Sequence, residues 1–89
     1  MKAIITVVGK DTVGILATIS GKCADYKVNV LEVTQSILQD MFCMIMLIDL
    51  KDCTIPYTDF SDKITEEGTK KNLVVHVMHE DIFNSMHRI

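Results

Sequence analysis

Two segments of the chain are apolar at nearly every position, and each predicts a β-strand that is covered on both faces. Residues 2–8 carry apolar or β-branched side chains on both faces of an extended strand, and Gly9 ends the run. Residues 41–50 are still more uniformly apolar. Strands that read as continuous apolar runs are typical of the middle of a sheet, so we expect these two strands to be central.

The stretch after the first strand predicts a turn and an amphipathic helix. Asp11 or Thr12 is suited to the N-cap, and the helix is expected to continue to about Tyr26. Its apolar stripe follows steps of three and four residues: Leu16, Ile19, Cys23 and Tyr26. A strand-to-helix turn directs the unpaired amides of the first helical turn toward one point, which favours a carboxylate or another anion.

Gly14 and Gly21 are both placed inside this predicted helix. A glycine there costs up to about 1 kcal/mol relative to alanine, so each requires a reason. For Gly14 the two candidate reasons are close approach of a ligand or backbone and tight packing. Gly21 is interpreted as a packing contact.

The remaining elements follow the same reasoning. A second strand is expected at residues 30–38, with Leu31, Val33 and Ile37 on one face, and a short turn joins it to the strand at 41–50. Thr58 is the predicted N-cap of a second helix, which Gly68 weakens or ends. A fourth strand over 73–78 and a short helix over 80–87 complete the chain.

This order, β-α-β-β-α-β with a terminal helix, predicts an α+β fold of the ferredoxin-like type and a single domain over residues 1–89. Right-handed crossovers give an antiparallel sheet of order 4-1-3-2 with both helices on one face. Two helices cover one face of such a sheet. We therefore expect a second protomer or a partner domain to cover the other face.

Composition narrows the classes of partner. The 89-residue chain has a net charge of −3 and one arginine, Arg88, which argues against binding of a nucleic-acid backbone. Its apolar runs are shorter than the roughly 18–20 residues that cross a bilayer. The first residues lack the apolar segment and cleavage site of a signal peptide. We expect a cytoplasmic protein without a membrane partner.

Cysteine and histidine offer two weaker alternatives. Cys23, Cys43 and Cys53 lack zinc-ligand spacing and are expected to be reduced and mostly buried, and no spacing singles out a Cys–His nucleophile pair. A metal site would have to draw on the histidines and acids near the end of the chain: His76, His79, Glu80, Asp81 and His87. Residues three apart on a strand point to opposite faces, so solvated or capping histidines are the simpler interpretation. No metal, cofactor or catalytic residue is predicted.

The segment Asp11-Thr12-Val13-Gly14-Ile15-Leu16, followed by Val28-Asn29-Val30, resembles the signature of the ACT domain, a small-molecule-sensing module of amino-acid metabolism. In that family Asp-x-x-Gly-(Ile/Leu)-(Leu/Val) opens the first helix and Asn-(Ile/Val) opens the second strand. The ending over residues 79–89 further resembles small stand-alone bacterial ACT proteins of unassigned function, which are related to the ACT half of the glycine-cleavage repressor.

The resemblance implies a ligand site formed by two segments and often completed across a dimer interface. Its residues are Asp11, Thr12, Val13, Gly14 and Ile15 from the loop, with Asn29 and Val30 from the second strand. Family members bind amino acids such as serine or phenylalanine there. Amides at residues 13–15 would hold the ligand carboxylate, the Asn29 amide would bond its ammonium or carboxylate, and Asp11 would meet the ammonium or cap the helix. Thr12 and Val13 replace the family's frequent Arg or Lys and Pro, which predicts a less rigid turn.

The expected function is therefore that of a regulatory module without catalytic activity. It would bind an amino acid or a similar small carboxylate as a homodimer or higher homo-oligomer. It would act in trans on an enzyme or a transcription factor. The alternative is a structural interaction module whose apolar sheet face docks on a partner without any ligand.

Overall fold

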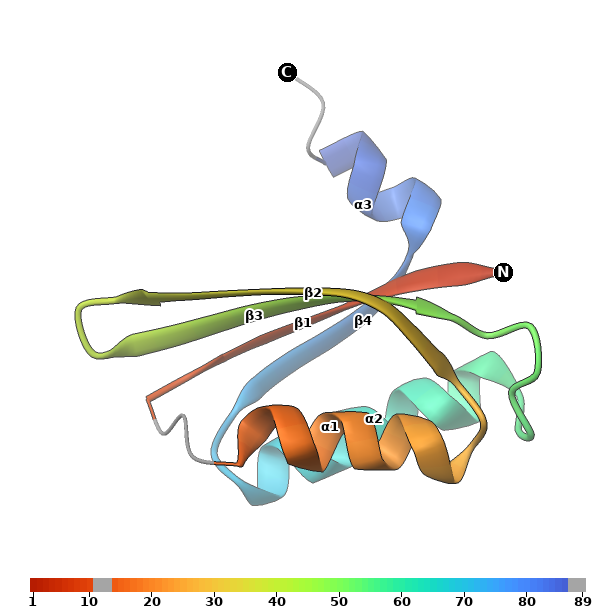
Figure 1. Ribbon diagram of the computed structural model, residues 1–89, viewed down its shortest axis with the longest axis horizontal. Helices are drawn as coiled ribbons and strands as arrows, with labels where there is room; N and C mark the ends of the chain where they lie inside the picture. The colour runs from red at the N-terminus through yellow and green to blue at the C-terminus, as the bar shows by residue number, and fades with distance from the viewer. Residues whose placement is uncertain (11–13, 87–89) are drawn as a thin grey trace.

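Two apolar strands, β1 (Lys2–Gly9) and β3 (Met41–Asp49), lie side by side at the centre of a four-stranded antiparallel sheet in the computed structural model. The structure describes residues 1–10 and 14–86. Strand β2 (Asn29–Leu38) flanks β3, and β4 (Val74–His79) flanks β1, giving the order β2-β3-β1-β4 (Figure 1). This is the predicted order 4-1-3-2 read from the other edge, and it confirms the ferredoxin-like fold.

Helices α1 (Ile15–Asp25) and α2 (Tyr57–Lys70) cover one face of the sheet, as predicted, and α3 (Glu80–Met86) rises from the opposite face (Figure 1). The core lies between the sheet and the first two helices. Tyr26 and Phe60 join the two helices through an edge-to-face ring contact, with 6.2 Å between the ring centroids. The sheet and the helices contribute these fully buried side chains to the core: Ile5, Val7, Met44, Met46, Ile48, Ile19, Cys23, Phe60 and Ile64.

Helix α1 differs from its prediction at its start. It begins at Ile15, and its N-cap position is Gly14 rather than Asp11 or Thr12, which lie outside the described residues. Its buried side chains are Ile15, Ile19 and Cys23, whereas Leu16 is 38% exposed. The predicted stripe was wrong at Leu16 because a spacing of four residues selects Ile15, and Leu16 lies about 100° further around the helix.

Helix α2, by contrast, begins earlier than predicted. Tyr57 is its first residue and Pro56, not Thr58, occupies the N-cap position, where the Pro56 carbonyl accepts the Phe60 N–H at 3.0 Å. Proline suits a helix start because it has no N–H to leave unpaired. Asp59 in the first turn and Lys70 in the last turn match the helix dipole.

Both helices end in the same hydrogen-bonded turn. At the end of α1 the Val28 N–H donates to the Cys23 carbonyl (2.8 Å), and at the end of α2 the Leu73 N–H donates to the Gly68 carbonyl (2.8 Å). Lys27 and Asn72 each occupy the left-handed position, with φ of 58° and 59°. These are Schellman motifs, and they satisfy carbonyls that the helix leaves unpaired.

Of the two roles predicted for Gly68, ending α2 is excluded, because the helix continues to Lys70. A Cβ on Gly68 would overlap the Val75 side chain, so this glycine allows close approach of helix and strand. The interpretation of Gly21 was also wrong. Gly21 is exposed, and a Cβ there would meet nothing within 4 Å.

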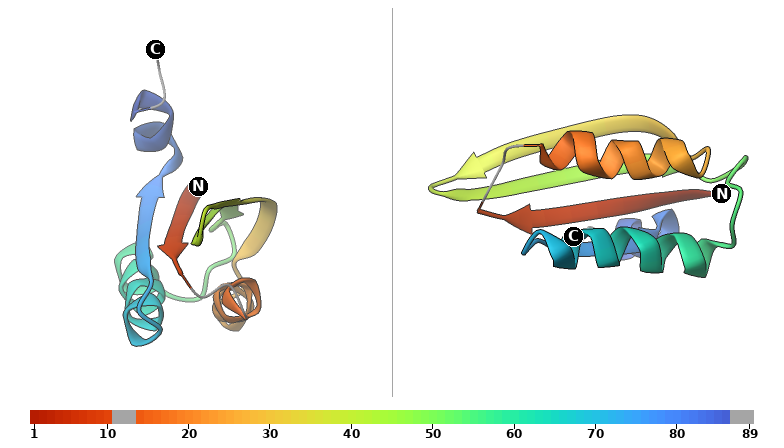
Figure 2. Two further views of the ribbon diagram at one scale, coloured as in Figure 1. Left: turned by 90° about the vertical axis from the view of Figure 1, so that its left-hand side faces the viewer. Right: turned by 90° about the horizontal axis from the view of Figure 1, so that it is seen from below.

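Strand β2 forms one edge of the sheet and is interrupted by a bulge between Val30 and Glu32. The bulge removes Leu31 from the register, so of the three residues predicted to share a face only Val33 and Ile37 do so, opposite Met46 and Phe42. The β2–β3 hairpin extends beyond the start of α1 (Figure 2).

The face opposite α1 and α2, here termed the open face, is covered only in part among the described residues. Helix α3 contacts β1 and β4, and Ile4 on this face is buried. Ile45 and Val74, also on this face by their register with Thr6 and Val8, are 38% and 57% exposed. That a second chain covers the rest of the open face remains a prediction.

Candidate functional site

Helix α1 begins after a glycine in an unusual backbone conformation. Gly14 has φ of +76°, a left-handed conformation that L residues rarely adopt, and its carbonyl accepts the Thr18 N–H at 2.8 Å. Among the described residues, a Cβ at Gly14 would meet nothing within 4 Å, so tight packing against them does not explain this glycine. The left-handed backbone conformation explains it.

The first-turn amides of α1 face no acidic side chain from their own turn. Among the described residues no side chain caps this helix, and its first turn contains no acid. The N–H groups of Ile15 and Leu16 are among those that a helix leaves without an intrahelical partner. Together with the helix dipole they favour an anion, as the sequence suggested. Asp11, Thr12 and Val13 of the predicted site lie outside the described residues.

The second predicted segment begins β2. Asn29 is exposed and pairs with Asp49 of β3, while Val30 is half-buried opposite Ile48. Val28, immediately before them, is buried and anchors the end of α1. The Asn29 side chain therefore projects from a fixed strand start.

Within one chain the two segments do not meet. Gly14 stands at the start of α1 and Asn29 follows its end, and the 11 residues of that helix span about 16 Å. The sheet register agrees: Gly9 pairs with Phe42 and Phe42 with Ile37 at one end, whereas Asn29, Asp49 and Lys2 lie at the other. In Figure 1, α1 runs beneath the sheet from the side of the β2–β3 hairpin, which extends beyond its first turn, to the side where β2 begins.

The β2 edge carries a row of exposed side chains that the sequence pattern did not reveal. Every residue from 31 to 38 is exposed. The apolar members of this row are Leu31 (40%), Val33 (37%), Ile37 (67%) and Leu38 (73%). A long apolar edge strand is a template for pairing with another chain. Apolar periodicity predicted one buried face for this edge strand, and it could not show how much of that face the helices leave exposed.

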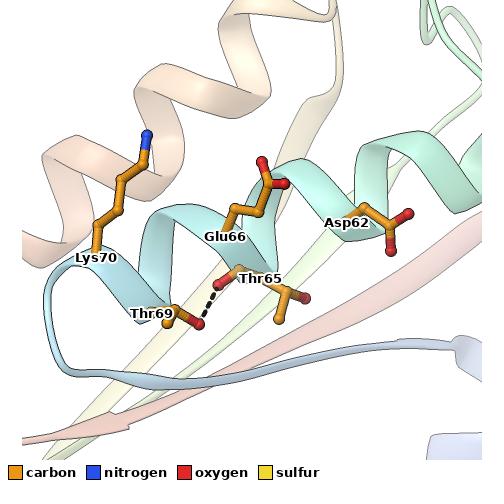
Figure 3. A pocket seen from close by; sticks show the side chains of 5 residues that line it. All are labelled: Asp62, Thr65, Glu66, Thr69 and Lys70. Carbon is orange, nitrogen blue, oxygen red and sulfur yellow. Dashed lines mark hydrogen bonds between the residues drawn. The ribbon is translucent and has the colours of Figure 1, made fainter.

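A hollow of about 640 Å³ lies on α2, away from both predicted segments, and suggests no chemistry. All five lining residues belong to α2: Asp62, Thr65, Glu66, Thr69 and Lys70 (Figure 3). The Thr69 hydroxyl donates to the Thr65 backbone carbonyl at 3.0 Å, which is a local bond within the helix. This is the solvated polar face of a surface helix.

The cysteines lack the features of an activated nucleophile. Cys23 is fully buried, and burial, with a smaller effect of the nearby Cys53 thiol, raises its pKa to about 11. A raised pKa disfavours the reactive thiolate. Cys43 and Cys53 are free and half-buried rather than mostly buried, so the burial prediction is confirmed for Cys23 alone.

The histidines do not form a metal site in the described part of the chain, where no group of three metal-ligating side chains occurs. His79 Nδ1 accepts the Asp81 N–H at 3.1 Å at the start of α3, and so acts as a cap. His76 is exposed and pairs with Thr6 of β1. His87, the remaining histidine of that alternative, lies outside the described residues.

Among residues 1–10 and 14–86, none of the helices combines the length and apolarity that crossing a membrane would require.

Comparison with known proteins shows where the chain belongs. A family model described as ACT domain matches residues 2–66. A UPF0237 protein of Clostridium acetobutylicum is 44% identical over 89 residues, which is the whole of both chains. The solved structure of an ACT domain protein from Streptococcus pneumoniae superposes with a TM-score of 0.81 at 35% identity, covering 93% of each chain.

A more distant structure shares the fold. It is that of a putative glycine cleavage system transcriptional repressor, with a TM-score of 0.71 at 19% identity, covering 85% of this chain and 43% of that one. The family match and the relative that covers the whole chain show the family, and the superposed structures share the fold. The chain belongs to the ACT domain family.

Proposed function

We propose that this protein is a non-catalytic regulatory module that binds an amino acid between two copies of the chain and acts on a partner in trans. One observation carries the proposal: the two segments of the ACT signature stand at opposite ends of α1, about 16 Å apart. A site that uses both segments therefore needs two chains.

Antiparallel pairing of two β2 edges supplies the required geometry. In such a pair, Asn29 of the partner subunit lies opposite the Leu38 end of β2, which is also the end at which α1 begins. Both views of Figure 2 show α1 beneath the β2–β3 side of the sheet, so the helix begins on the side of the β2 edge. A twofold axis then creates two equivalent sites and leaves neither edge unpaired.

The chemistry of the composite site suits an amino acid. The first-turn amides of α1 would receive the ligand carboxylate, and the Asn29 side chain of the partner subunit offers both a donor and an acceptor. Asp11, if its side chain reaches the site, would meet the ammonium group. An amino acid bound between two chains favours the dimer by mass action, and that shift would be the signal.

The alternative function is a structural interaction module without a ligand. The exposed apolar side chains of the open face, Ile45 and Val74, favour it. In both cases we place the protein in the cytoplasm, with an enzyme or transcription factor as the regulated partner.

Thermal unfolding against each of the twenty amino acids tests the proposal. A sensor gains several degrees with one or two of them, and its dimer fraction, measured by sedimentation, rises with the same ligand. No gain with any amino acid would favour the interaction module instead.

Subunit mixing then tests the composite site. Gly14→Val and Asn29→Ala should each abolish the ligand-induced shift, whereas Gly21→Val and Asn84→Ala, at exposed glycine and asparagine positions elsewhere, should retain it. Mixing the two defective variants creates heterodimers in which one of the two sites is intact. Binding should therefore return on mixing. A mixture as inactive as its components would contradict a site shared between chains.

A further inference from the structure

A second hollow lies at the Gly9 end of the open face, between the start of β3 and the start of β4. Its volume is about 470 Å³, within the range of small-molecule sites. Three apolar side chains line it, Val8, Met41 and Val74, together with three polar ones, Lys10, Lys71 and Asn72. We refer to it as the basic hollow.

The apolar side of the basic hollow is continuous and exposed to solvent. Val8 and Val74 are direct partners across the β1–β4 pair, and Val74 is 57% exposed. Met41 at the start of β3 is 36% exposed. Apolar surface on two neighbouring strands and a third, held by the sheet, provides a preformed floor for an apolar ligand group.

The polar side of the basic hollow carries the opposite charge to the chain. The protein has a net charge of −3, yet among the described residues both charged side chains that line this hollow are lysines. Within the described residues neither Lys10 nor Lys71 forms an ion pair. Asn72 is fixed beside them by the Schellman turn that ends α2, where its N–H donates to the Thr69 carbonyl at 3.2 Å.

We propose that the basic hollow binds a monocarboxylate with an apolar body and no ammonium group, such as a medium-chain or aryl carboxylic acid. The carboxylate lies between the two lysine ammonium groups and the Asn72 amide, and the apolar body covers Val8 and Val74. A free amino acid fits poorly, because its ammonium group would face two lysines or an apolar floor. This site needs neither the amino-acid site nor the dimer proposed above.

Octanoate is the probe that tests this proposal, observed through the methyl resonances of Val8, Met41 and Val74 in the full chain. Octanoate should shift these resonances saturably at millimolar concentration. Acetate has the carboxylate without the long alkyl chain, and octyltrimethylammonium has the alkyl chain with a cation in place of the carboxylate. Both should shift these resonances far less than octanoate does. Equal shifts with the cation would overturn the proposal, because they would show an apolar patch without anion selectivity.

Charge-reversal variants provide a second test of the carboxylate site. Lys10→Glu and Lys71→Glu should each weaken octanoate binding about three- to tenfold, whereas Lys27→Glu, an exposed lysine at the end of α1, should leave it unchanged. Uniform weakening in all three variants, or no shift with octanoate, would overturn the site. Shifts that follow protein concentration without octanoate would do so as well, by showing that a second copy occupies this surface. All of these readouts are independent of any amino-acid effect on unfolding.

Discussion

Gly68 of α2 lies so close to Val75 of β4 that a Cβ on the glycine would overlap Val75 Cγ2. Both residues are buried, and the Gly68 carbonyl also accepts two N–H groups of the turn that follows, from Lys71 and Leu73. Gly68 thus sets how closely α2 approaches β4, and its carbonyl holds the turn that connects the helix to the strand.

Gly68→Ala should destabilise the fold by about 1–3 kcal/mol, because an added methyl group in a closely packed contact forces neighbours to move. Urea unfolding measures this loss. Adding Val75→Ala to that variant removes the overlapping methyl groups, so the two substitutions together should cost less than the sum of their separate costs. Additive losses would mean that Val75 is not the group that the new methyl meets.

Gly21→Ala should have the opposite effect. Gly21 is exposed within α1, and a Cβ there meets nothing within 4 Å. Alanine in a helix interior is favoured over glycine by roughly 0.5–1 kcal/mol, so the free energy of unfolding should rise by that amount. A decrease in urea midpoint would show that Gly21 has a contact in the folded protein, for example with a second copy.

Lys27→Gly should also stabilise the chain, by about 1 kcal/mol. Lys27 is exposed and takes the left-handed conformation, with φ of 58°, in the turn that ends α1. Side chains with a Cβ are disfavoured there and glycine is not. Lys51→Gly is the matched control at an exposed lysine outside the left-handed positions, and it should give no gain. Equal effects of the two substitutions would contradict the conformational explanation.

These examples show how much of the fold the sequence could predict. Apolar runs identified β1 and β3 as central strands and, with the handedness rule, gave the whole sheet order. The pattern could not assign the glycines. Gly14, Gly21 and Gly68 read alike in sequence, yet one serves a left-handed turn, one meets nothing and one allows close packing. Spatial neighbours and φ angles distinguish them, and neither is encoded locally.

The sequence motif named candidate residues for the site but not their arrangement in space. The motif drew attention to Gly14 and Asn29, which do occupy a helix start and a strand start. Their separation along α1 depends on where the helix begins and ends, and the proposal of a site shared by two chains rests on it. The exposed apolar row on β2 was missed because the alternation of residues 31–37 predicts one buried face and does not show how far the helices leave the edge strand uncovered.

The raised pKa of Cys23 predicts that the protein loses stability at alkaline pH. Burial raises its pKa from 9.0 to about 11, so between these values the unfolded chain binds fewer protons than the folded one. The stabilising effect of the protonated thiol is fully present below about pH 9 and is lost as pH rises through 11. Urea unfolding across this range should show a steeper decline for the wild type than for Cys23→Ala. Burial also raises the pKa of Tyr57, and its effect cancels in this comparison.

Gly14 offers the test that links local conformation to the site. Gly14→Ala should destabilise the fold by about 1–2 kcal/mol because alanine is strained at φ of +76°. Gly14→Asn should lose less, since asparagine tolerates the left-handed region better than other side chains. Neither side chain meets a neighbour within 4 Å of its Cβ, so both variants should fold. Urea unfolding measures both losses, and equal losses would mean that the conformation of Gly14 is not what requires glycine.

If the amino acid approaches this backbone, the asparagine variant should recover stability without recovering the ligand-induced shift, which would separate the structural role of Gly14 from its role in binding.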